Sequence, residues 1–136
     1  MVVNKSRREL LLLSGGNVLR SYRISLGFDP VGHKVKDGDG RTPEGRYAID
    51  RRNPRSAYHL SLRISYPNEA DRLRAGELGV DPGGDIMIHG LPNGVDAAER
   101  GHPERDWTRG CIAVSDAEME EIWSLVADGT AVEINP

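Results

Sequence analysis

The sequence predicts one mostly-β domain, a sandwich-like or barrel-like arrangement of mixed sheets with two short helices. Short apolar runs recur along the chain, and residues 18–26 alternate with the two-residue period of a half-buried strand. Clusters of Gly, Pro, Asn and Asp separate these runs, as expected for turns. No repeat, linker or low-complexity stretch divides the 136 residues, so we expect a single domain over 1–136.

The expected strands follow one another in short steps. Gly15, Gly16 and Asn17 predict a hairpin turn between the second and third strands, because Gly and Asn adopt positive φ at low cost. Residues 85–89 are apolar enough for a central strand that is buried on both faces. The full set of expected strands is 1–6, 9–13, 18–26, 46–50, 57–65, 85–89, 112–115 and 130–134.

Two segments carry helix signals. In 67–78, Pro67 suits a first turn and Asn68 or Ser65 is a candidate cap. The expected buried edge of this helix is Ala70, Leu73 and Leu78. The second helix begins after Ser115, which forms a Ser-x-x-Glu capping box with Glu118. Its expected buried stripe is Met119, Ile122, Trp123 and Val126.

Two irregular stretches interrupt the strand pattern. Residues 27–45 form a long turn-rich loop, and loops of this length in compact domains usually have a function or move. Residues 91–106 join the strand that ends at His89 to the strand that follows Cys111. We therefore expect the second stretch to lie over any site that these two residues form.

Composition excludes several classes of protein. The net charge is −3 with both signs interspersed, which gives no electrostatic case for binding nucleic acid. A single cysteine cannot form an internal disulfide and leaves too few thiolates for a structural zinc site. The longest purely apolar run, 10–13, is too short to span a membrane or to form the core of an export signal.

Cys111 has two interpretations. A free cysteine beside Ile112 and Val114 is often a small buried hydrophobe. A nucleophile instead needs a flexible flank and hydrogen-bond donors near the sulfur, and Gly110 allows consecutive N–H groups to point at one spot. Arg109 adds a positive charge that favours the thiolate.

His89 also has two interpretations, a satisfied core histidine or the general base of Cys111. No Asp or Asn is placed in the sequence to orient its ring, so a backbone carbonyl is the alternative. The other histidines, His33, His59 and His102, show no spacing typical of metal ligands. We therefore expect no metal and no cofactor, with a zinc peptidase kept as a rival hypothesis.

Two motifs together resemble a known family. Ile88-His89-Gly90 followed by Thr108-Arg109-Gly110-Cys111-Ile112 is similar to the His-Gly … Ser/Thr-x-Gly-Cys-Ile pattern of the L,D-transpeptidase catalytic domain, also called the YkuD domain. The segment 40–45, Gly-Arg-Thr-Pro-Glu-Gly, resembles the Thr-Pro-x-Gly turn that precedes a strand in that family. The resemblance covers nearly the whole chain.

The resemblance implies a YkuD-like mostly-β fold and a cysteine acyl transfer that releases D-alanine from peptidoglycan stem peptides. It implies Cys111 as nucleophile and His89 as base. The expected oxyanion and substrate-binding residues are Gly110, Arg109, Thr108 and Gly90. It also implies a location in the periplasm or cell envelope, and we expect a monomer. Arg109 and Ala113 depart from the His and Arg that are common in the family, which affects the expected binding of a substrate carboxylate.

Several functions fit the same motifs. Transfer to an amine gives a cross-link, whereas transfer to water gives an L,D-carboxypeptidase. A lipoprotein that is linked to the stem through a lysine is a further conceivable partner, which would make the protein an amidase. A catalytically inactive wall-binding module is the rival from another class, and it predicts an unreactive thiol.

Overall fold

A computed structural model describes residues 1–136. Its strands form one 8-stranded mixed sheet in the order β3-β2-β1-β8-β4-β5-β6-β7, so the predicted mostly-β class is confirmed. The pairs β1–β8 and β6–β7 are parallel and the other neighbours are antiparallel. The strands are β1 Val2–Asn4, β2 Glu9–Ser14, β3 Asn17–Arg23, β4 Gly45–Ser56, β5 His59–Ile64, β6 Met87–His89, β7 Ile112–Ala113 and β8 Ala131–Asn135.

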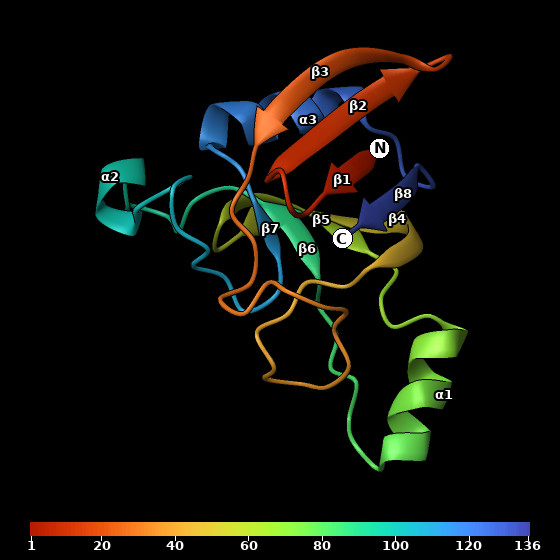
Figure 1. The fold of residues 1–136 in the computed structure, drawn as a ribbon. Helices are drawn as coiled ribbons and strands as arrows, with labels where there is room; N and C mark the ends of the chain where they lie inside the picture. Colours follow the sequence, from red (N-terminus) through yellow and green to blue (C-terminus); the bar gives the residue numbers. More distant parts are fainter.

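The sheet curls until its two ends meet. Ser25, just beyond β3, exchanges two backbone hydrogen bonds with Ala113 of β7, and Gly27 forms a bridge with Thr108. Figure 1 shows the resulting arrangement, in which β1 to β3 lie across the layer formed by β4 to β7. The curl encloses a hydrophobic cluster of 20 buried residues. The expected barrel-like arrangement of mixed sheets therefore describes the fold.

Three helices accompany the sheet: α1 Glu69–Leu78, α2 Ala97–Arg100 and α3 Asp116–Leu125. The predicted capping box of α3 is present, and the helix packs its buried Met119 and Ile122 toward β5 and β6. The one-turn helix α2 is absent from the prediction, because four residues are too few to show a helical period. No helix in the structure has both the length and the apolar character needed to cross a bilayer.

The helix α1 packs differently from its prediction. Leu73 and Leu78 are 59% and 52% exposed, so the expected apolar edge is wrong. The buried residues of the helix are Asp71 and Ala75. Asn68 caps the helix and exchanges hydrogen bonds with Asp71 in a capping box. A polar anchor, rather than an apolar stripe, therefore holds α1, and Figure 1 shows the helix standing at the rim of the sheet.

Several strand boundaries also differ from the prediction. β4 runs over 12 residues instead of five, because it pairs first with β8 and then with β5. The expected strand 85–89 begins only at Met87, because Asp85 has a φ of 53° and turns the chain there. Asp85 therefore lies at the mouth of β6 instead of inside the sheet.

The loop 27–44 packs closely on the turn before Cys111. A Cβ at Gly110 would lie 2.7 Å from the carbonyl oxygen of Arg41, and φ at Gly110 is 140°. Only glycine therefore fits there without moving the loop. The Gly27 N–H donates to the Thr42 hydroxyl at 3.1 Å, which ties the Thr-Pro-Glu-Gly turn to the same region. The loop and the cysteine turn consequently form one packed unit.

Candidate active site

Parallel pairing of β6 with β7 brings the predicted pair together. His89 is in register with Ala113, and Cys111 lies two residues before Ala113. Side chains two residues apart along an extended chain point to the same face, so Cys111 and His89 share a face of the sheet. Both residues line one open cleft of about 950 Å³. The sequence signal for this pair was the His-Gly and Gly-Cys motifs.

The Cys111 thiol is held by backbone groups. The Met87 N–H donates to Sγ at 3.4 Å, and the S–H donates to the carbonyl oxygen of Asp85 at 3.4 Å. Burial raises the pKa of Cys111, and the Asp85 charge adds to this, whereas the Met87 N–H and the Lys34 charge oppose it. The expected lowering of the thiol pKa by Arg109 is therefore wrong. The resting sulfur is a neutral thiol at pH 7.

His89 is fixed through one ring nitrogen. Its side chain is buried, and Nδ1 lies 2.7 Å from the carbonyl oxygen of Gly90. A carbonyl only accepts, so Nδ1 carries the proton and Nε2 keeps its lone pair. Burial lowers the pKa of His89 to about 4, although the hydrogen bond to Gly90 opposes that shift. The ring is therefore a neutral base oriented by a backbone carbonyl.

Aromatic side chains form the wall beside His89. The Tyr58 ring lies 4.4 Å from the His89 ring, centroid to centroid, and the Trp107 ring lies 5.7 Å from it. The guanidinium of Arg100 stacks over Trp107 at 4.7 Å. Trp107 is held from behind, because its Nε1–H donates to Nδ1 of the buried His102 at 3.2 Å. This wall keeps water from the inner side of the imidazole and explains the burial of His89.

The residues predicted for oxyanion and substrate binding differ from one another in burial and in hydrogen bonding. Thr108 is buried, and its hydroxyl donates to the Cys111 carbonyl at 2.7 Å and accepts from the Gly110 N–H at 3.1 Å. The Gly110 N–H is therefore occupied in the resting structure, whereas the Cys111 N–H makes no hydrogen bond within the protein. Arg109 is exposed at the edge of the cleft and forms no ion pair.

Gly90 supports the site through its backbone and its lack of a side chain. Its carbonyl orients His89, as described above. A Cβ at this position would lie 2.6 Å from Oδ1 of Asp116, the atom that accepts the Leu91 N–H at 2.8 Å. Glycine is therefore needed where the chain leaves β6 and passes the start of α3.

Charged residues from two loops also line the cleft, and the sequence patterns did not indicate them. Lys34 and Asp37 come from the loop 27–44, and Asp85 comes from the turn before β6. Lys34 is buried, with Nζ 2.8 Å from Oδ1 of Asp39. No local signal marks these residues, because long-range packing of irregular chain decides their placement.

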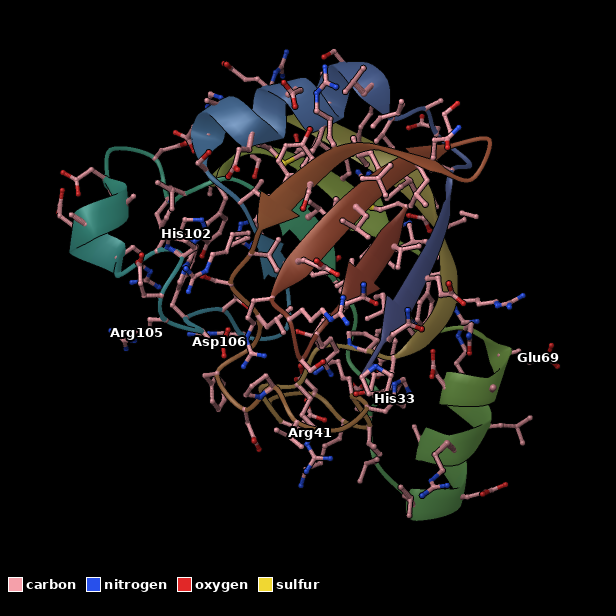
Figure 2. All side chains as sticks on the ribbon, turned by 45° about the horizontal axis from the view of Figure 1, so that its top comes forward. His33, Arg41, Glu69, His102, Arg105 and Asp106 are labelled. Carbon is pink, nitrogen blue, oxygen red and sulfur yellow. The ribbon has the colours of Figure 1, made fainter.

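The expected lid lies mainly beside the cleft. From 91–106, only Arg100 lines the cavity, whereas Leu91 and Ala97 pack behind Trp107. Asp106 fastens the end of this segment, because its carboxylate accepts from the Arg8 guanidinium at 2.8 Å and from the Leu26 N–H at 3.0 Å. Figure 2 shows His102 turned inward in this region and Arg105 turned outward.

The four histidines lie in separate networks. His33 contacts Asp71, His59 contacts Glu120, and His102 contacts Ser25. His89 contacts the backbone of Gly90. No three His, Cys, Asp or Glu side chains lie close enough together to hold a metal ion. The cleft is thus lined by a thiol, a neutral imidazole and the side chain of a buried lysine.

Comparisons with known proteins agree with this geometry. The model of the YkuD family, the L,D-transpeptidase catalytic domain, matches residues 1–134. YafK, a candidate L,D-transpeptidase of Escherichia coli strain K12, is 30% identical over 111 residues, which cover 80% of this chain and 37% of that protein.

Solved structures share the fold. The helical cell shape determining protein Pgp2 of Campylobacter jejuni has a TM-score of 0.72 and 27% identity, covering 98% of this chain and 46% of that one. An L,D-transpeptidase of Xylanimonas cellulosilytica has a TM-score of 0.62 and 18% identity, covering 98% of this chain and 58% of that one.

The chain spans 37% of the length of YafK and 46% of the Pgp2 chain, so it corresponds to one part of each. That part is the domain described by the family model, which matches from the first residue to residue 134. The fold, the His-Gly and Gly-Cys motifs and their shared cleft agree with the match. The chain therefore belongs to the YkuD family of L,D-transpeptidase catalytic domains.

Proposed function

We propose that this protein is a cysteine-dependent L,D-transpeptidase that acts on peptidoglycan stem peptides in the cell envelope. The observation that carries the proposal is the fixed tautomer of His89. Its Nδ1–H donates to Gly90, so the basic Nε2 is left for the thiol that lines the same cleft. A neutral ring nitrogen with a lone pair in the same cleft as a thiol is the arrangement expected of a general base and its nucleophile.

The first step is the attack of sulfur on a carbonyl carbon. Because both groups are neutral at rest, the thiol proton passes to Nε2 of His89 as the C–S bond forms. The carbonyl oxygen becomes an oxyanion, and the unpaired N–H of Cys111 is the donor available to it. Burial of His89 makes its imidazolium a strong acid, which favours a rapid second transfer of the proton.

The second step releases the leaving group. The tetrahedral intermediate collapses, the C–N bond breaks, and Nε2 returns the proton to the departing amine of D-alanine. The acyl group remains on Cys111 as a thioester. An amine from another stem then attacks the thioester to give a cross-link and regenerate the thiol, or water attacks it to give a shortened stem.

Similarity to Pgp2, described as a helical cell shape determining protein, supports a role in shaping the wall. Hydrolysis is the second candidate outcome, because the cleft is open to solvent on one side. A stem that is linked to a lipoprotein lysine is a further candidate donor, in which the leaving amine belongs to that lysine. All of these outcomes share the thioester on Cys111.

The test uses a purified disaccharide tetrapeptide and three proteins: wild type, Cys111→Ala and His89→Gln. We expect the wild type to release D-alanine, with the dimer-to-tripeptide ratio reporting transfer against hydrolysis. Cys111→Ala should give no detectable product, and His89→Gln should release D-alanine about 10²-fold to 10⁴-fold more slowly than wild type. Equal product formation by wild type and Cys111→Ala would refute the proposal, and a chelator-sensitive activity would favour a zinc peptidase.

An unreactive thiol would point to the wall-binding module. Alkylation by iodoacetamide at neutral pH, compared with a free cysteine standard, measures this directly. A module without catalytic function predicts no alkylation of the native protein and no product from any stem. The proposed enzyme predicts alkylation that is slower than that of the standard at pH 7, because the thiol is mainly protonated, and faster as the pH rises.

A further inference from the structure

Lys34 occupies an unusual position for a lysine. Its side chain is 3% exposed, yet it lines the same cleft as Cys111. Burying an ammonium is costly unless it is paired, and lysine side chains usually reach the surface with their amine. The amine of Lys34 instead contacts the Lys36 carbonyl and Asp39 within the loop 27–44. A cost of this kind needs a structural or a functional reason.

The loop holds this amine in one place. Nζ donates to Oδ1 of Asp39 at 2.8 Å and to the carbonyl of Lys36 at 3.0 Å. Burial by itself raises the pKa of Asp39, but hydrogen bonds from Lys34 and three backbone N–H groups lower it to about 2. An ammonium has three N–H donors, and the protein uses two of them. The third has no partner within the protein.

The other cations of the cleft are held less firmly. Arg109 is exposed without an ion pair, and the guanidinium of Arg100 is stacked on Trp107. The carboxylates of Asp37 and Asp85 also line the cleft, but both residues are exposed and water screens their repulsion of an anion. Lys34 is buried, so its charge acts with less screening. A preorganised ammonium beside a nucleophile is suited to a carboxylate.

We propose that Lys34 determines specificity by binding the free carboxylate of the residue that leaves when Cys111 attacks the preceding carbonyl. Consecutive residues lie about 4 Å apart, so a cation within a few ångströms of the sulfur reaches the next carboxylate along the chain. Lys34 and Cys111 line the same cleft, and the Lys34 charge opposes the rise in the pKa of that thiol, so the two side chains act on the same space. The inference rests on the proposed function and narrows it to donors that end one residue past the scissile bond.

Charge-selective alkylation tests this without any peptidoglycan. Iodoacetate carries a carboxylate and iodoacetamide is its neutral counterpart, and both alkylate the same sulfur. In the wild type, the iodoacetate-to-iodoacetamide rate ratio should exceed the ratio for free cysteine at the same pH. Lys34→Gln keeps a donor for Asp39 and removes the charge, and it should lower the iodoacetate rate about tenfold while iodoacetamide changes by about twofold or less.

Lys36→Gln is the matched control, because that side chain is exposed on the same loop and outside the cleft. Lys36→Gln should leave the iodoacetate-to-iodoacetamide rate ratio unchanged. Lys34→Arg keeps the positive charge and should keep most of the wild-type ratio. An equal fall of both rates in Lys34→Gln would show that the ammonium acts on the sulfur itself and would overturn the inference. A wild-type ratio at or below that of free cysteine would do the same, even if Lys34→Gln fails to fold.

A substrate pair then separates this inference from the proposed function. Wild type should prefer a tetrapeptide with a free terminal carboxylate over its terminal amide, and Lys34→Gln should reduce that preference at least tenfold, mainly through KM. If Lys34→Gln is active and keeps the wild-type preference for the free carboxylate, the role of Lys34 is refuted and the proposed function stands. No activity on either peptide, with the alkylation pattern intact, would refute the stem-peptide function and leave the carboxylate site standing.

Discussion

His89 and His33 lie in two regions that use the same side chain differently. The His33 ring bridges the loop 27–44 and α1, with Nε2 at 2.8 Å from Asp71 and Nδ1 accepting the Glu44 N–H at 2.7 Å. Both of its nitrogens are occupied. In His89 only Nδ1 is occupied, and the other nitrogen is left for the cleft.

The contacts of the two rings distinguish a candidate base from a structural histidine. A histidine beside an aspartate is the arrangement that catalytic triads lead one to look for. Here the His33–Asp71 pair holds α1 against the sheet, because Asp71 also accepts from the Tyr47 hydroxyl at 2.8 Å. The candidate base has only a backbone carbonyl behind it. A free nitrogen in the same cleft as the thiol, and not the presence of a carboxylate, marks the site.

The largest effect should follow from removing the sulfur. Cys111→Ala should lower the rate of D-alanine release by about 10⁴-fold or more, because Cys111 carries the only thiol of the protein and the serine and threonine hydroxyls that also line the cleft are much weaker nucleophiles. Its unfolding midpoint in urea should stay close to that of the wild type. Product release is measured on purified protein, and Cys111→Ser serves as the isosteric control, expected to be nearly as inactive. A fully active Cys111→Ala would show that the cleft with Cys111 and His89 is not the catalytic site.

Matched histidine variants give the next largest effect. His89→Gln keeps an N–H for the Gly90 carbonyl but loses the base, and kcat should fall about 10²-fold to 10⁴-fold. His33→Gln should leave kcat within about threefold at a temperature where the protein is folded, and should lower its stability instead. Steady-state kinetics and urea unfolding of both variants provide the readouts. A large fall of kcat in His33→Gln with little change in His89→Gln would contradict the assignment of His89 as base and His33 as structural support.

The support region should respond in stability. Asp71→Ala leaves the Tyr47 hydroxyl, His33 and the Asn68 N–H without their acceptor, which should cost about 2–4 kcal/mol of unfolding free energy. Glu69→Ala is the control on the same helix, because its side chain points into solvent in Figure 2 and should change stability by about 0.5 kcal/mol or less. Equal effects of the two variants in urea unfolding would show that α1 has no polar anchor.

A smaller effect concerns pH. The folded His89 has a pKa of about 4, below its ordinary value of 6.5, so the unfolded chain binds more protons between these values. The free energy of unfolding should therefore fall by about 2 kcal/mol between pH 7 and pH 5 through this group. Burial also lowers the pKa of His102, which adds to the slope. Urea unfolding of His89→Gln should show a shallower dependence; an unchanged slope would mean that His89 is not buried as a neutral ring.

The sequence was sufficient for the parts that local chemistry controls. The capping box at Ser115 and Glu118 and the strand-end positions of His89 and Cys111 are short-range patterns, and the structure contains each of them. The resemblance to the YkuD domain placed the pair in one fold, and the family match confirms that membership.

The remaining features depend on long-range packing. Leu73 and Leu78 suggested an apolar edge for α1, but the contact with the body of the protein is made by Asp71 through Tyr47 and His33. Arg109 has the right charge beside Cys111 in the sequence but is exposed in the structure. Lys34 is far away in the sequence and buried at the cleft, because the loop 27–44 folds back on the cysteine turn.

The most direct measurement is the intact mass of the protein during the first turnovers on a disaccharide tetrapeptide. Wild type should gain one acyl group on Cys111 with release of one D-alanine, and His89→Gln should form the same adduct much more slowly. Hydroxylamine should remove the adduct, as it does with thioesters. D-alanine release without any adduct, or an adduct that persists in Cys111→Ala, would contradict the assignment of Cys111 as nucleophile and His89 as base.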